Sequence, residues 1–169
     1  MGNRLQRILK HRWHDEADTR RAIPPATLER LAAQVADSER RHTGEIRIYV
    51  EAGLPMSYLW RGATARERAI AMFGKLGVWD TAQNNGVLIY LLLAEHAIEI
   101  VADRGLSHHV DAAQWQQIVQ GMTEAFRAGR YEAGLEQAVQ AVDALLVRHF
   151  PAAAGAANPN ELPDEPVLG

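Results

Sequence analysis

Acidic and amide residues flank the most hydrophobic stretch of the chain, residues 87–94. Asp80, Asn84 and Asn85 precede this stretch, and Asp103 follows the next apolar segment. Carboxylate and amide oxygens are the ligands that Ca²⁺ and Mg²⁺ prefer, and such an ion could hold a phosphate and activate water. The same residue types also make turns and cap helices. The sequence therefore allows two interpretations, a cation site or the turns around a buried hairpin.

The histidines give weaker evidence of a metal site or a catalytic site. His11 and His14 are spaced to share one face of a helix and could bind a metal, but no third ligand is in view, so a solvated pair is favoured. His108 and His109 are adjacent and make a poor chelate, although one of them could act as a base beside Asp103. The sequence has no P-loop, no G-x-S-x-G and no H-E-x-x-H motif.

The composition excludes several functional classes. The chain has no cysteine, which removes disulfides, thiol catalysis and thiolate zinc sites together. Its formal net charge of −3 leaves no basic surplus, so we expect no nucleic-acid partner. The longest apolar run is far shorter than the roughly 20 residues of a membrane helix, and the N-terminus lacks the apolar core of a signal peptide. We therefore expect a cytoplasmic protein without a transmembrane segment.

Hydrophobic periodicity predicts the elements that must position the candidate residues. Alternation in 43–53 and 97–103 and a continuous apolar run in 87–94 predict three strands. Helical spacing predicts helices over 3–20, 26–41, 64–77, 111–127 and 135–149. A helix between two strands implies a right-handed crossover if those strands are parallel. The predicted fold is α/β, a three-layer α/β/α sandwich whose small mixed sheet of three to four strands is covered by helices on both faces.

Capping signals support two of these helices. Thr64 and Glu67 are spaced as a capping box, and Gly77 can supply the left-handed residue after the helix end. Asp111 and Gln114 repeat the capping-box spacing at the start of the next helix. Asp111 can therefore serve either as a cap or as a ligand.

The topology predicts that the candidate residues meet at one edge of the sheet. If the first two strands are parallel, Thr43 lies near Asn84 and Asn85, and an antiparallel third strand returns Asp103 and Arg104 to the same edge. The predicted cation ligands are Asp80, Asn84, Asn85, Asp103 and Asp111, and the predicted phosphate- or ligand-binding residues are Thr43 and Arg104. A strand of eight residues is about 26 Å long, so Glu51 lies at the opposite end.

The chain divides into three predicted parts: a basic amphipathic helix over 1–23, the α/β/α domain over 24–150 and a disordered Pro/Ala-rich tail over 151–169. Leu5, Leu9 and Trp13 form a narrow apolar stripe and are the predicted docking residues. A basic helix of this kind can lie on an anionic membrane or fold back onto its own domain. Folding back is favoured because acidic residues interrupt the basic face and the stripe is narrow.

Three blocks of sequence together resemble the TPM domain family, which includes thylakoid-lumen photosystem II repair proteins and bacterial membrane-anchored relatives. The blocks are "TGEIRIYVE", "NNGVLIYLLLAEHAIEIVADRGL" and "FRAGRYEAGLEQAV", and the resemblance covers roughly residues 26–150. It implies an α/β/α sandwich, an acidic groove that binds Ca²⁺ or similar ions in some members, and the acid-phosphatase activity reported for a plant member. Carried over by position, the groove would involve Asp80, Asn84, Asn85, Asp103 and Asp111.

The sequence departs from the family pattern in two ways. It lacks the signal peptide and trailing membrane helix of many bacterial members. It also has "ADRGL" where the family often has a glycine-rich turn, so Arg104 adds a positive charge at the rim of the groove. Arg104 could bind phosphate or could take the place of a cation. Either role weakens the inference of a metal.

Two functions follow from these observations. The favoured one is a divalent-cation-binding interaction module, taking Ca²⁺ or Mg²⁺, with a protein partner in a membrane-associated or stress and repair assembly. Such a protein would be cytoplasmic and peripheral to the membrane. The alternative is a metal-dependent phosphomonoesterase in which Asp80 and Asp103 bind the ion and Arg104 binds phosphate. The module is favoured because no nucleophile–base pair is visible.

Overall fold

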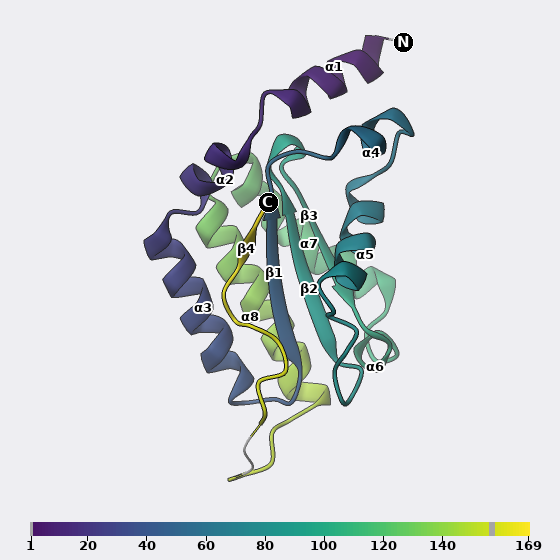
Figure 1. Cartoon of the computed structure of the whole chain (residues 1–169). Coiled ribbons are helices and arrows are strands. Elements are labelled where there is room, and N and C mark those ends of the chain that lie inside the picture. Colours follow the sequence, from purple (N-terminus) through teal and green to yellow (C-terminus); the bar gives the residue numbers. More distant parts are fainter. Residues whose placement is uncertain (1, 156–157) are drawn as a thin grey trace.

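A four-stranded mixed sheet forms the centre of the computed structural model, which describes residues 2–155 and 158–169 (Figure 1). The strand order is β3 (Ala97–Ala102), β2 (Gly86–Leu92), β1 (Glu45–Glu51) and β4 (Val167–Leu168). β1 pairs in parallel with β2 and with β4, and β2 pairs antiparallel with β3. The predicted pairing of the first three strands is therefore confirmed.

Helices cover both faces of this sheet, which confirms the predicted α/β sandwich (Figure 1). α3, α7 and α8 contribute to the hydrophobic core on one face, and α4 and α5 contribute to the core on the other. The helices are α1 (Gly2–Arg12), α2 (Glu16–Ala22), α3 (Pro25–Glu39), α4 (Met56–Trp60), α5 (Ala65–Lys75), α6 (Arg104–Ser107), α7 (Ala112–Arg127) and α8 (Tyr131–His149), and a 3₁₀ turn, η1 (Leu93–Glu95), follows β2.

β1 is buried on both faces, although its sequence alternates like that of a strand with one polar face. Ile46, Ile48 and Val50 join the core under α3 and α8. The other face is made of Arg47, Tyr49 and Glu51, which alternate with them and are also buried. Buried polar groups need partners, and these side chains find them in the C-terminal segment and in α5.

The predicted capping residues cap α5 and α7 in the structure. Thr64 and Glu67 form the capping box of α5, and Gly77 has a φ of +68° after its end. Asp111 caps α7 by accepting the backbone N–H of Gln114. Asn84 has a φ of +51°, so the Asn-Asn-Gly turn leads into β2 through a left-handed residue.

The N-terminal region contains two helices where the sequence predicts one over 3–20. Asp15 accepts the N–H groups of Ala17 and Asp18, and the Asp18 side chain accepts the Asp15 N–H. This capping box begins α2 and separates it from α1. Within residues 2–155 and 158–169, no helix combines the length and the apolar character needed to cross a membrane.

The C-terminal segment also differs from its predicted disorder, because residues 158–169 lie against β1 (Figure 1). Leu162 is buried and its N–H donates to the Glu45 carboxylate over 3.0 Å. Arg47 donates to the Glu165 carbonyl over 2.7 Å, and the Gly169 N–H donates to the Val50 carbonyl over 2.8 Å. A composition without apolar periodicity does not reveal this packing, because β1 supplies the partners.

Candidate functional site

The register of β1 and β2 brings residues 43–45 beside residues 84–86 at one end of the sheet, since Glu45 pairs with Gly86. Asn85 Nδ2 donates to Thr43 Oγ1 over 3.2 Å. Thr43 Oγ1 in turn donates to Gln83 Oε1 over 3.0 Å. These bonds orient the Asn85 amide so that its Oδ1 remains available as an acceptor.

The turn after β3 comes to the same end. Asp103 N–H donates to the Gly86 carbonyl over 2.9 Å, and Gly105 N–H donates to the Asn84 carbonyl over 2.8 Å. A Cβ on Gly105 would lie only 2.5 Å from the Asn84 carbonyl oxygen, so glycine is needed for this approach. We call residues 81–86 and 103–105 together the rim.

Two buried oxygens at the rim have no hydrogen-bond partner among the residues that the structure describes: Asn85 Oδ1 and Asp103 Oδ2. Asn85 is fully buried and Asp103 is 9% exposed. The other Asp103 oxygen accepts the N–H of Arg104 over 2.7 Å. A buried acceptor without a donor costs about 1–3 kcal/mol, and a cation or an ordered water would remove that cost. These two oxygens are therefore candidate ligands of an ion.

The other predicted cation ligands, and Arg104, have exposed side chains. Asp111 is exposed and its Oδ1 accepts the Gln114 N–H over 2.8 Å, as a helix cap does. The side chains of Asp80, Asn84 and Arg104 are also exposed. In the described part of the chain, no three His, Asp or Glu side chains are grouped as a metal would require. Any ion at the rim would therefore depend on amide, carbonyl and water oxygens besides Asp103.

Sequence reasoning missed two residues of the rim. Thr81 Oγ1 accepts the Asn85 N–H over 3.1 Å, and Gln83 accepts from Thr43. Both lie in the "DTAQNNG" segment, whose polar side chains at alternate positions were the available signal. Thr81 thus holds the Asn85 backbone, and Gln83 holds Thr43, which accepts from the Asn85 amide.

A second polar cluster lies at the opposite end of the sheet, around Glu51. Arg68 Nη2 donates to Glu51 Oε1 over 2.6 Å, and Tyr90 Oη donates to Glu51 Oε2 over 2.6 Å. Burial and the Glu51 charge raise the pKa of the Tyr90 hydroxyl above its usual value, and they raise the pKa of Tyr49 to about 12. Because each Glu51 oxygen already has strong donors, this cluster stabilises the packing of α5 on the sheet.

Ser38, His42 and Asp143 carry the residue types of a nucleophilic triad, but not its geometry. Ser38 Oγ lies 2.9 Å from His42 Nε2, and Asp143 Oδ1 lies 3.7 Å from the same nitrogen. A catalytic histidine uses its two nitrogens for the two partners. His42 is also fully buried, and this burial lowers its pKa to about 4. Ser38, His42 and Asp143 are therefore not arranged as a catalytic triad.

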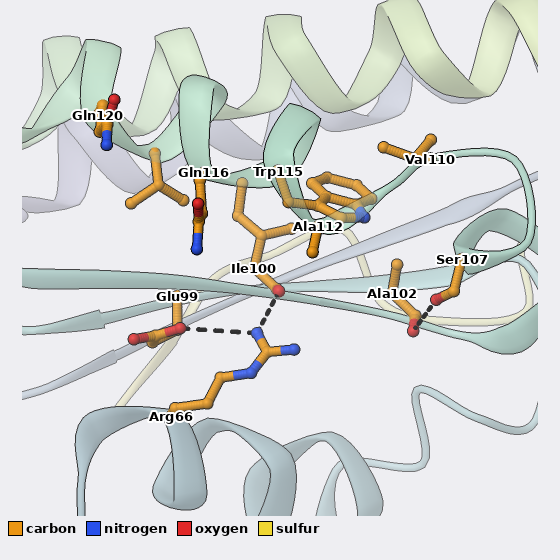
Figure 2. A pocket seen from close by; sticks show the side chains of 11 residues that line it. Arg66, Glu99, Ile100, Ala102, Ser107, Val110, Ala112, Trp115, Gln116 and Gln120 are labelled. Carbon is orange, nitrogen blue, oxygen red and sulfur yellow. Dashed lines mark hydrogen bonds and ion pairs between the residues drawn. The ribbon is translucent and has the colours of Figure 1, made fainter.

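A pocket of about 720 Å³ lies over the open edge of β3, between α5 and α7 (Figure 2). Arg66 Nη1 donates to the Ile100 carbonyl over 2.5 Å, and Ser107 Oγ donates to the Ala102 carbonyl over 2.9 Å. These side chains occupy backbone acceptors that would otherwise attract another strand. Neither Asn85 nor Asp103 lines this pocket.

Comparison with known proteins supports the fold. The family model described as the TPM domain matches residues 17–145. The NMR structure of BA42 protein from the psychrophilic bacterium Bizionia argentinensis is 23% identical, covers 87% of this chain and 95% of its own, and has a TM-score of 0.74. The solution NMR structure of the N-terminal domain of a P. gingivalis protein is 20% identical, covers 76% and 81%, and has a TM-score of 0.56. A search of curated proteins found no match.

Proposed function

Because this chain belongs to the TPM domain family, we propose that it is a divalent-cation-binding interaction module whose ion is held at the rim. One observation carries the proposal: Asn85 Oδ1 and Asp103 Oδ2 are both buried and lack hydrogen-bond donors in the described residues. They belong to adjoining turns that are joined by backbone hydrogen bonds. A cation is a natural partner for such oxygens.

The ligand chemistry favours Ca²⁺ over Mg²⁺. Ca²⁺ accepts carbonyl, amide and water oxygens in flexible geometry, whereas Mg²⁺ demands a near-ideal octahedron and gives up water reluctantly. Asp103 is the one buried carboxylate of the rim. With so few charged ligands, we expect weak binding, with a dissociation constant of roughly 0.1–1 mM.

The proposal is tested by thermal unfolding of chelator-treated protein titrated with Ca²⁺, Mg²⁺ and Mn²⁺. An ion that binds only the folded state adds about 2.7 kcal/mol at 100 times its dissociation constant, which raises the Tm by about 5–10 °C for a chain of this size. We expect Asp103→Asn to remove the Ca²⁺ shift while still capping α6, because asparagine is an equally good cap.

Asp111→Asn is the matched control, because it preserves the cap of α7 and changes the charge by the same amount. The Ca²⁺ shift should remain in this variant. An absent shift with all three ions would contradict the proposal. An equal loss of the shift in both variants would instead indicate a general effect of surface charge.

A metal-dependent phosphomonoesterase is the weaker proposal. In the described segments, no hydrogen bond or ion pair joins the side chains of Asp80, Asp103 and Arg104, which would have to act together. The same protein preparations should be incubated with a phosphomonoester and Ca²⁺ or Mg²⁺. Turnover lost in Asp103→Asn and retained in Asp111→Asn would favour the enzyme over the binding module.

A further inference from the structure

Helix α1 is attached to the domain through its polar face. Arg7 Nε and His11 Nε2 lie 2.7 and 2.9 Å from the same oxygen of Glu95. The Leu54 N–H donates to His11 Nδ1 over 2.9 Å, and Arg7 also donates to the Ala63 carbonyl. His11 is buried as a result. The helix therefore folds back, as the sequence analysis favoured, with Arg7, Ile8 and His11 toward the domain.

Two large apolar side chains of α1, and Trp13 directly after its end, are exposed to solvent. Leu5, Leu9 and Trp13 are 63%, 60% and 83% exposed and follow one another at intervals of four residues. Met56 and Trp60 of α4 are exposed at the same end of the molecule, where α1 and α4 lie together (Figure 1). We call these five residues the α1–α4 surface.

An ordinary amphipathic helix of a globular protein buries its apolar stripe, whereas here Ile8 packs on the domain and Leu5, Leu9 and Trp13 are exposed. In the part of the chain that the structure describes, the α1–α4 surface holds five of the seven large apolar residues that are exposed. The other two, Ile70 and Trp79, lie in or after α5. Exposed apolar side chains gathered at one end of a protein are typical of an interaction surface.

The charges around the α1–α4 surface identify the kind of partner. Residues 2–12 contain four Lys or Arg and no acidic residue, in a chain whose overall charge is −3. Lys10 and Arg12 are exposed, and neither forms an ion pair within residues 2–155 and 158–169. Apolar and tryptophan side chains bordered by cations suit the interface of an anionic bilayer, where the rings lie at headgroup level.

We propose that the α1–α4 surface binds the surface of an anionic lipid bilayer, with α1 parallel to the membrane plane. Leu5, Leu9 and Trp13 enter the interface, and Lys10 and Arg12 contact the headgroups. An 11-residue helix is too short to span the bilayer, so the association is peripheral and reversible. This inference does not depend on the cation proposed for the rim.

Flotation of the full chain with lipid vesicles tests the proposal. Vesicles of phosphatidylcholine alone are compared with vesicles in which about one-third of the lipid is phosphatidylglycerol. We expect binding to the anionic vesicles that weakens as salt is raised. Lys10→Gln with Arg12→Gln should lower the partition coefficient by about 25-fold, since each cation near the surface contributes about fivefold.

The apolar contribution is tested by Leu5→Gln, Leu9→Gln and Trp13→Gln combined, which should reduce binding by at least about tenfold. Ile70→Gln with Trp79→Gln is the control, because it removes exposed apolar side chains elsewhere on the molecule. Since the three α1 side chains are exposed, the Tm should stay within a few degrees of the wild type.

Four results would overturn the proposal. One is the absence of vesicle binding by the wild type, and another is equal binding to neutral and anionic vesicles. A third is an equal loss of binding in the control variant. The fourth is a dimer, seen by analytical ultracentrifugation, that the triple α1 variant dissociates while no vesicles are bound, because the surface would then belong to a second copy of the chain.

Discussion

Glu95 shows how one carboxylate positions the N-terminal helix. It accepts from Arg7 and His11, and the hydrogen bond from His11 is the main reason that its pKa falls to about 2, with Arg7 adding to the effect. The Leu54 N–H occupies His11 Nδ1, so the ring carries its proton on Nε2 and donates it to Glu95. His11 thus satisfies a backbone donor and an acid at once.

His11→Ala should release α1 from the domain. The substitution leaves the Leu54 N–H without its acceptor and removes one donor from Glu95, which costs about 2–3 kcal/mol of local stability. An isolated helix of this length is marginal in water, so exchange of the α1 amide hydrogens should accelerate by roughly 30- to 150-fold. Arg12→Ala, at the neighbouring exposed position, is the control and should leave exchange of the α1 amide hydrogens close to that of the wild type. Protection of α1 that survives in His11→Ala would contradict the role given to this residue.

At the rim, the sequence predicted which turns meet but not the roles of individual atoms. Topology alone brings Thr43 to Asn85 and returns Asp103 to the same end, because strand direction is encoded in the order of the elements. Both acids accept a backbone N–H at the start of a helix, Asp103 from Arg104 and Asp111 from Gln114. Asp111 is exposed to water, whereas the second oxygen of Asp103 is buried without a donor in the described residues. Such differences of a few ångströms are set by packing and are invisible in residue spacing.

The pairing of the C-terminal segment with β1 depends on acids that are buried between them. Glu39 Oε1 accepts the Ile46 N–H over 2.9 Å, and Glu45 accepts the Leu162 N–H. Burial raises the pKa of Glu39 to about 8, with Glu45 and Asp164 adding repulsion. Burial also raises the pKa of Glu45. The folded chain is therefore more stable when these acids carry protons, because burial disfavours their charged forms.

The free energy of unfolding should fall between about pH 4.5 and pH 8 on account of Glu39. Its pKa is higher in the folded chain, so the folded state binds more protons in this window and loses stability as they dissociate. Glu39→Gln keeps an acceptor for the Ile46 N–H without a charge. The variant should exceed the wild type at pH 8.5 by an amount on the order of 3 kcal/mol and should differ little at pH 4.5. Urea unfolding at both pH values measures this difference, and a constant difference across the range would refute the burial argument.

Among the elements, the strands and long helices were the most predictable because their signal is local. Alternation around Ile48 and the apolar run after Gly86 predict the sheet, and Thr64 predicts the start of α5. The short helices α4 and α6 were missed because four or five residues carry little periodicity. The stripe of α1 was visible, but periodicity does not tell which face of a helix packs on the domain.

The whole molecule separates two surfaces along the strands. The rim lies at the N-terminal ends of β1 and β2, where Glu45 pairs with Gly86. α1 is attached beyond the other ends of the same strands, through Leu54 and Glu95. Seven strand residues span about 23 Å. A chain bound to a bilayer through α1 and α4 would therefore present the rim away from the membrane, available to an ion and to a partner.

Cation binding at the rim and vesicle binding at the α1–α4 surface should be independent. Coupling between sites needs an element with two arrangements that both ligands bias, and the sheet between them is packed on both faces. The triple α1 variant should keep the full Ca²⁺-induced rise in Tm, and Asp103→Asn should bind anionic vesicles as the wild type does. Ca²⁺ also screens anionic lipid, so its effect on flotation must be compared between the wild type and Asp103→Asn, in which the screening is identical. A Ca²⁺-dependent change in vesicle affinity that occurs in the wild type and disappears in Asp103→Asn would show that the two ends communicate and would contradict the rigid sheet.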